Sequence, residues 1–311
     1  ETIHQVVEKQ IERLDAGERE VLSMAAVLGR TFEYRDLEAL ADGRPDVEDV
    51  TDRLLRQGLL DEERESRGDR LSFASGVVRE ALYAGLSRRR RRILHRRYAE
   101  WLERRHAGKE RVWAQLAHHF SQGDVPEKAV EYGIKAARKS LDAFSAEEAI
   151  RAAKTALEFL EDEEWEGDRR LEGEARMLLA AAYRIEGNIE GGLREVERAL
   201  RVFDRERDPA LVLAAFLAAA ETAWEGRRIE ETRRWVERGI DAARGTEHAD
   251  TLSRLLSLGA TVANLRGEYE AAREYLEEVE RLRPDAVGYE EAIPQGGTLV
   301  VGLGGPCTSF E

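Results

Sequence analysis

The stretch LLAAAYRIEGNIEGGLREVERAL, residues 178 to 200, decides how most of this chain folds. Two later stretches superimpose on it at a fixed step: LAAAETAWEGRRIEETRRWVERGI (217 to 240) and LGATVANLRGEYEAAREYLEEVERL (258 to 282). One small residue recurs at a step of 40, as Ala180, Ala220 and Ala260. Gly187 and Gly267 lie 80 positions apart, which is twice that step. Such self-similarity predicts a solenoid of stacked helical units.

Each unit has a small residue in a first helix, a turn near the glycine, and a second helix with further small or apolar positions. This pattern resembles the tetratricopeptide repeat, and the residues that fit it are Ala180, Tyr183, Gly187, Ile189, Ala199 and Leu200, then Ala220, Ile229 and Gly239, then Ala260, Gly267, Tyr269, Ala272 and Pro284. An upstream unit carries Ala137, Ala149, Ala153 and Ala156, and a half or full unit precedes it at residues 112 to 137. A step of 40 rather than 34 implies longer helices or loops than the standard repeat.

A curved array of this kind presents a groove lined by the first helix of each unit, and we expect a protein or peptide partner there. The resemblance places six residues in the groove: Met177, Arg184, Glu221, Trp224, Thr261 and Asn264. Trp224 is either an exposed anchor or a tryptophan packed between helices. Residues 109 to 284 contain 28 Lys and Arg against 37 Asp and Glu. That balance of −9 favours a basic or mixed polypeptide over DNA or an acidic ligand.

The composition agrees with a helical fold. Of 311 residues only 6 are Pro, and Ala, Leu, Glu and Arg dominate, so we expect an all-α protein. We find no run of apolar residues long enough for a membrane span and no signal-peptide order at the N-terminus, and so expect a cytoplasmic protein. The single cysteine, Cys307, excludes an internal disulfide. The chain begins at Glu1, and we expect it to be a fragment of something longer.

The first 75 residues predict three helices followed by a β-hairpin, which is the order of a winged helix. The helices are expected at residues 17 to 28, closed by Gly29, near 35 to 41, and after Asp46, which can cap the third. Leu59 and Leu60 lead into the hairpin, and Leu71 and Phe73 return from it. Residues 46 to 58 and 61 to 70 each have a net charge of −2. A packing module is therefore favoured over a DNA-binding one.

The run SRRRRRILHRRYAEWLERR, residues 87 to 105, contains nine arginines. Leu94, Tyr98, Trp101 and Leu102 recur at helical spacing and predict a buried stripe. The basic helix residues Arg88, Arg89, Arg90, Arg91, Arg92, Arg96 and Arg97 fall on the other faces. There they either pair with acids of the same chain, which makes the helix a structural connector, or form a patch for a nucleic acid or acidic partner.

Residues 15 to 160 resemble the region after the nucleotide-binding core in large bacterial signalling ATPases of the STAND class. The resemblance rests on AAVLGRTFEYRDLEAL, RQGLL, LSFASGVVREALYAGLSRRRRRILHRRYAEWLERR and AQLAHHFSQGDVPEKAVEYGIKAA. It is similar to regulators related to the maltose-regulon activator and to ATPases fused to kinases or cyclases. The resemblance implies that a winged helix packs on an upstream ATPase domain of the same polypeptide while the repeats sense a ligand or partner. Phe73 is followed by Ala74 where the family often has a histidine, so no nucleotide-sensing role is expected there.

Catalytic motifs are missing from the sequence. There is no GxxxxGK[ST] phosphate cradle and no GxSxG nucleophile turn, so we expect a non-catalytic chain without a cofactor. His118 and His119 are adjacent, which turns them about 100° apart on a helix. Because metal sharing within one helix needs a spacing such as HxxxH, we expect no metal site here, but one buried and one surface histidine.

Four segments are expected: a winged-helix module at 1–75, connector helices at 76–108, repeats at 109–284, and a linker at 285–311. In the last, GGTLVVGLGG looks either like the opening strand of an oligopeptide-class solute-binding protein or like the disordered end of a truncated chain. The function expected is regulatory scaffolding within a signal-transduction ATPase. The alternative is a transcriptional regulator that contacts DNA through the winged helix or through residues 88 to 105.

Overall fold

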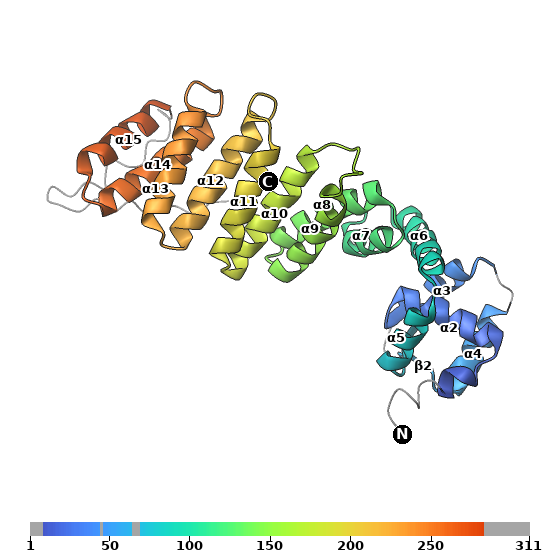
Figure 1. Ribbon diagram of the computed structural model, residues 1–311. Coiled ribbons are helices and arrows are strands. Elements are labelled where there is room, and N and C mark those ends of the chain that lie inside the picture. The colour runs from blue at the N-terminus through green and yellow to red at the C-terminus, as the bar shows by residue number, and fades with distance from the viewer. Residues whose placement is uncertain (1–8, 44–45, 64–68, 283–311) are drawn as a thin grey trace. The chain divides into compact units, whose positions relative to one another are not determined.

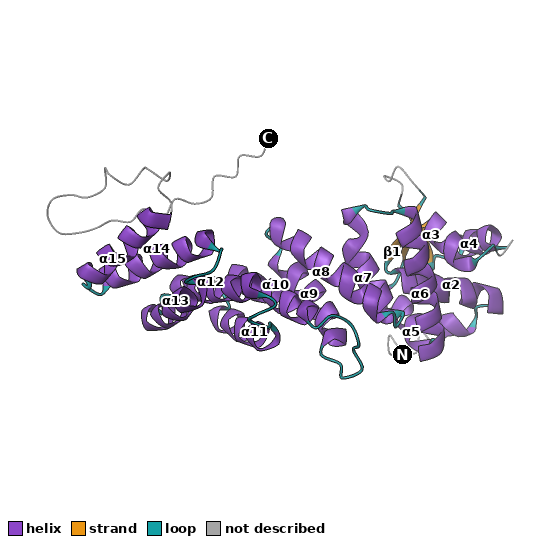
Figure 2. Cartoon of the chain, turned by 90° about the horizontal axis from the view of Figure 1, so that it is seen from above, coloured by secondary structure: helices purple, strands orange, loops and turns teal. Residues whose placement is uncertain are grey.

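The computed structural model describes residues 9–43, 46–63 and 69–282. The chain divides into two compact units, Glu1–Lys139 with Arg151–Gly167, and Ser140–Ile150 with Asp168–Glu311. Helices dominate the described residues, and the strands found there all belong to the first unit (Figure 2). The expected all-α class is therefore confirmed. The four-segment division stays a prediction, and the expected solute-binding-like start, Cys307 and Pro284 lie outside the described residues.

The first unit begins with the predicted helices and hairpin. Its elements are α2 (Ala16–Leu28), β1 (Thr31–Glu33), α3 (Tyr34–Ala41), α4 (Val47–Arg56), β2 (Leu60–Glu62) and β3 (Arg70–Phe73). β3 is the central strand of an antiparallel sheet in the order β1-β3-β2, with Phe32 opposite Leu71 and Leu60 opposite Phe73. The sequence did not predict β1, because three residues are too few to show an alternating pattern.

The N-terminus of α2 has a capping side chain, whereas the N-terminus of α4 does not. Asp15 and Glu18 form a reciprocal capping box at the start of α2. Asp46 occupies the N-cap position of α4, but its side chain makes no capping hydrogen bond to the helix. The expectation that Asp46 caps is therefore wrong. Its backbone, at φ −99° and ψ 3°, departs from the extended conformation that aims an N-cap side chain at the first amides.

Further helices follow in the first unit: α5 (Gly76–Gly85), α6 (Arg88–Arg105), a short 3-10 turn at Glu110–Val112, and α7 (Trp113–Gln122). α8 (Pro126–Asp142) and α9 (Ala146–Leu160) follow, and the division between units passes through both. A Cβ on Gly133 of α8 would lie only 3.0 Å from the carbonyl oxygen of Ala152 and from the Cβ of Ala156. The small residues expected in the upstream repeat thus let its two helices approach closely.

The second unit holds three helical hairpins that stack in sequence order. They are α10 (Arg170–Glu186) with α11 (Ile189–Val202), α12 (Pro209–Glu225) with α13 (Ile229–Ala243), and α14 (Ala249–Leu265) with α15 (Tyr269–Leu282). Figure 1 shows these helices following one another. Each first helix also contacts the next first helix. The predicted solenoid is confirmed for this unit, and the first helices, at 17 residues each, account for part of the long step.

The alanines that set the step have matching surroundings. Ala180, Ala220 and Ala260 are each at most 3% exposed, in the C-terminal halves of α10, α12 and α14 respectively. A Cβ added to Gly192 of α11 would come within 3.3 Å of the carbonyl oxygen of Ala180. Small residues at these positions allow the two backbones of a repeat to pack closely.

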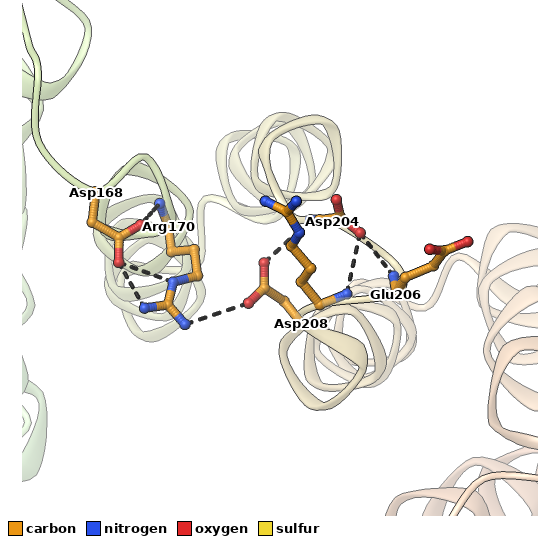
Figure 3. Close-up of polar contacts among 6 residues, drawn as sticks. Asp168, Arg170, Asp204, Glu206 and Asp208 are labelled. Carbon is orange, nitrogen blue, oxygen red and sulfur yellow. Dashed lines mark hydrogen bonds and ion pairs between the residues drawn. The ribbon is translucent and has the colours of Figure 1, made fainter.

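A set of polar contacts fixes where the second repeat begins (Figure 3). Arg170, at the start of α10, pairs with Asp168 at 2.7 Å and reaches Asp208 at 3.6 Å. Asp208 is the buried N-cap residue of α12. In the same loop the Asp204 side chain accepts hydrogen bonds from the backbone amides of Glu206 and Arg207. The contacts join the first helix of one repeat to the loop that starts the next.

Candidate partner-binding face and basic helix

The six expected groove residues lie on α10, α12 and α14, the first helices of the three stacked repeats. All six are half-buried: Met177, Arg184, Glu221, Trp224, Thr261 and Asn264. Positions 40 apart share their exposure, since Arg184, Trp224 and Asn264 are equivalent half-buried positions and Ile185, Glu225 and Leu265 are equivalent exposed ones. We call this surface of α10, α12 and α14 the first-helix face.

Ion pairs cross the first-helix face from one repeat to the next. The Arg184 guanidinium donates to the Glu225 carboxylate at 2.6 Å, joining α10 to α12. Arg254 of α14 pairs in the same way with Glu221 of α12. All four side chains are at least 30% exposed, so each pair stabilises the fold by well under about 1 kcal/mol. A partner that offers better-placed charges can therefore displace these pairs at little cost.

Apolar side chains lie among these charges. Trp224 packs partly against the hydrophobic core of the second unit and keeps part of its surface exposed, as does Met177. Trp224 thus stands between the two expected roles, anchor and packing residue. Ile185 is 42% exposed and Leu265 is 61% exposed. The six expected positions did not include these two residues, although the 40-residue step relates them directly.

The second unit also has a cavity of 380 Å³ that lies away from the first-helix face. Its lining comes from the second helices α11 and α13, from one residue of α12 and from Arg205 in the loop before α12: Glu197, Leu200, Arg201, Arg205, Phe216, Trp235 and Arg238. The Arg238 guanidinium lies over the Trp235 ring at 4.5 Å and over the Phe216 ring at 5.2 Å. Since none of the six groove residues lines this cavity, the first-helix face is a separate surface.

The basic helix is α6, and its buried stripe is as expected except at one position. Leu94, Tyr98 and Leu102 are buried, whereas Trp101 is only partly buried against the core. The sequence did not single out Ala99 and His95, which are also buried. Burial raises the pKa of the Tyr98 hydroxyl far above its ordinary value, so this side chain is uncharged.

Most of the basic-helix arginines contact other groups of the same unit. Acidic residues pair with Arg90 (Glu20, 3.0 Å), Arg92 (Asp124), Arg96 (Glu100, 3.1 Å) and Arg97 (Asp42, 3.5 Å). The Arg91 guanidinium lies 5.3 Å over the Tyr83 ring. Arg88 and Arg89 are exposed in the first turn of the helix. Five of the seven basic-helix residues thus contact an acidic or aromatic side chain of the same unit.

His118 and His119 lie on α7 in the way that the sequence predicts: His118 is exposed and His119 is 2% exposed. What the spacing did not reveal is a third histidine, His95 of α6, whose ring lies beside both. One ring nitrogen from each of the three residues belongs to a set of atoms that all lie within 4.8 Å of one another. Sequence spacing within α7 gave no signal for this cluster, because the third member is on another helix.

Fold and surface together define an all-α helical-repeat protein with a small antiparallel sheet in its first unit. Among the described residues, no helix combines the length and apolar character needed to cross a bilayer. No protein-family model matches the chain. No curated protein matches it in sequence either.

Comparison with solved structures finds similar chains at low sequence identity, three of which follow. The MamA protein is 13% identical, with a TM-score of 0.45, covering 65% of this chain and 97% of its own. BtubC from P. vanneervenii is 14% identical, with a TM-score of 0.49, covering 85% and 97%. A signal transduction ATPase with numerous domains and a tetratricopeptide repeat sensor, from Pyrococcus horikoshii, is 16% identical, with a TM-score of 0.42, covering 91% of this chain and 47% of its own. Likenesses of this extent carry no conclusion about activity or partners.

Proposed function

We propose that this chain is a non-catalytic regulatory section of a cytoplasmic signal-transduction ATPase, and that its repeats bind a protein or peptide partner on the first-helix face. The observation that carries the proposal is the 40-residue recurrence of exposed and half-buried positions along α10, α12 and α14. A surface that repeats in register along stacked helices suits an extended polypeptide.

The chemistry of the face suggests the class of partner. Arg184, Glu221, Glu225 and Arg254 offer both signs of charge, and Trp224, Ile185 and Leu265 offer apolar contact. Because residues 109 to 284 carry an excess of acidic groups, a basic or mixed segment with at least one large apolar side chain fits best. Trp224 and Arg184 belong to the residue types that concentrate binding energy at interfaces.

The first unit, in this proposal, is a winged helix that couples the repeats to an ATPase domain upstream in the same polypeptide. The order of three helices and a hairpin supports this role, as does the resemblance of residues 15 to 160 to the STAND class. The acidic balance of α4 and the hairpin disfavours DNA as its ligand. The ion pairs of α6 support a connector role for the basic helix.

The partner site is tested by capture with the full chain as bait, quantified by mass spectrometry. A Trp224→Ala, Arg184→Ala variant is compared with Arg194→Ala, which removes a 56% exposed arginine of α11, outside the first-helix face. We expect the double variant to lose most of the partner that the unmodified chain recovers, and the control to keep it. Equal recovery by the double variant and the unmodified chain would reject the proposed face.

The alternative, a DNA-binding regulator, makes a different prediction. We expect the full chain to elute from random duplex DNA below physiological salt, because four arginines of α6 already pair with acids. Retention at physiological salt that is lost in an Arg88→Ala, Arg89→Ala variant would favour the alternative. Hydrolysis of ATP by this chain alone would contradict the non-catalytic assignment.

A further inference from the structure

The first unit contains a cluster of three histidines that the partner-binding role does not use. His95 comes from α6, and His118 and His119 come from α7, the helix that packs against it. His95 and His119 are 1% and 2% exposed, whereas His118 reaches solvent. The cluster is therefore closed on the protein side and open at one residue.

The ring nitrogens of the buried pair face each other. The Nδ1 atoms of His95 and His119 are 2.8 Å apart, so one of them must carry the proton that joins them. The Nε2 atom of His95 lies 2.9 Å from the Tyr83 hydroxyl. When Nε2 donates to that hydroxyl, Nδ1 of His95 is left with a free lone pair directed at the cluster. In that tautomer the Tyr83 hydroxyl accepts from His95, which is the arrangement of an outer partner of a metal-bound histidine.

One cationic side chain of α6 lies near the cluster. The nearby Arg91 guanidinium acts against a cation and limits the affinity.

We propose that His95, His118 and His119 form a binding site for Zn²⁺, in which the ion joins α6 to α7. Three neutral imidazoles are a recognised ligand set for this ion, and a water completes the tetrahedron. The ion takes the place of the proton between the two Nδ1 atoms, and that proton moves to Nε2 of His119. Two nitrogens on one Zn²⁺ are about 3.3 Å apart, so the buried pair must separate by roughly 0.5 Å. The His118 ring already lies beside the other two, with its centroid 5.7 Å from that of His95 and 5.0 Å from that of His119.

The proposal is tested with the tag-free full chain after removal of metal by a chelator. Co²⁺, whose visible spectrum reports four-coordinate geometry, is titrated first, and Zn²⁺ is then added to displace it. We expect one ion per chain. His118→Ala, at an exposed position that leaves the core intact, should weaken binding at least tenfold, and His248→Ala, in the second unit, should leave it unchanged.

Tyr83→Phe distinguishes a positioned site from three adjacent histidines. Loss of the hydroxyl removes the hydrogen-bond acceptor of His95 Nε2, and we expect affinity to fall about tenfold with the number of ions unchanged. Circular dichroism of each variant checks that the helices remain. Absence of saturable binding to the unmodified chain, or binding that His118→Ala does not weaken, would overturn the proposal and leave the cluster as a hydrogen-bonded pair beside a surface histidine.

Discussion

Arg227 adopts a backbone conformation that its chemistry does not favour. Its φ of 56° lies in the left-handed region, where the equivalent residues 40 positions away are Gly187 (φ 81°) and Gly267 (φ 78°). In the middle repeat the glycine is displaced by one position, to Gly226, where a Cβ would lie 2.7 Å from Ile189. Gly226 allows close packing against Ile189, and the left-handed position of the turn is occupied by Arg227.

The first prediction concerns this turn. Arg227→Gly should raise the free energy of unfolding by about 0.5–1 kcal/mol, because relief of left-handed strain exceeds the entropy that glycine adds to the unfolded chain. Gly187→Ala should lower it by about 1 kcal/mol. Urea unfolding followed by circular dichroism measures both. A destabilised Arg227→Gly variant would show that the arginine side chain matters more than its backbone.

Arg176 carries a second prediction at this scale. Its buried guanidinium donates to Glu172 at 2.8 Å and to Glu195 at 2.9 Å, and both carboxylates are themselves buried. Arg176→Ala leaves Glu172 without its partner, so we expect a loss of about 3–5 kcal/mol in the free energy of unfolding. The matched control is Arg198→Ala, which removes a 49% exposed partner of Glu195 and should cost less than about 1 kcal/mol. Similar losses in both variants would contradict this account.

At the scale of elements, the joints between repeats depend on short polar loops as well as on apolar packing. Backbone hydrogen bonds from Glu206 and Arg207 lower the pKa of Asp204, and the Arg170 side chain lowers the pKa of Asp168. The charged form of each carboxylate is therefore more stable in the folded chain than in the unfolded chain. The stability that they contribute is therefore complete above the unfolded pKa of about 3.9 and is lost as the pH falls through the folded value.

The third prediction concerns this loss of stability at low pH. Asp204→Asn keeps an oxygen that can accept both amide hydrogen bonds but removes the charge, so its stability should depend less steeply on pH below about 4 than that of the unmodified chain. Above about pH 5 the two curves should run in parallel. Urea midpoints measured across this range supply the test, and identical curves in the acid region would show that the loop does not hold the Asp204 carboxylate as described.

The sequence predicted those elements whose cause is local. Ala180, Ala220 and Ala260 revealed the step, because close helix packing requires a small side chain at a fixed place in every repeat. The sequence did not predict β1, which is too short to show an alternating pattern, or the backbone conformation that keeps Asp46 from capping. It also did not predict the shift of the left-handed turn to Arg227, because that shift follows the packing of Gly226 against Ile189, which is distant in sequence. The candidate sites divide in the same way. The 40-residue step was enough to predict the first-helix face from the sequence. The pairing of Arg184 with Glu225 and the contact of His95 with His119 could be found only in the tertiary structure.

At the scale of the whole molecule, one arrangement underlies the proposed function: stacked helix pairs in the second unit repeat a single surface every 40 residues. Arg184, Trp224 and Asn264 contribute equivalent positions of that surface from three successive repeats. An extended partner that crosses it should contact all three, so its affinity should depend on the number of repeats that it spans.

Hydrogen exchange of the full chain, alone and with the partner recovered by capture, tests this claim most directly. We predict that the partner slows exchange in three peptides spaced by 40 residues, 177 to 185, 217 to 225 and 257 to 265, and leaves α11 and α13 unchanged. Protection confined to α6, or to the second helices of the repeats, would contradict the first-helix face as the binding surface.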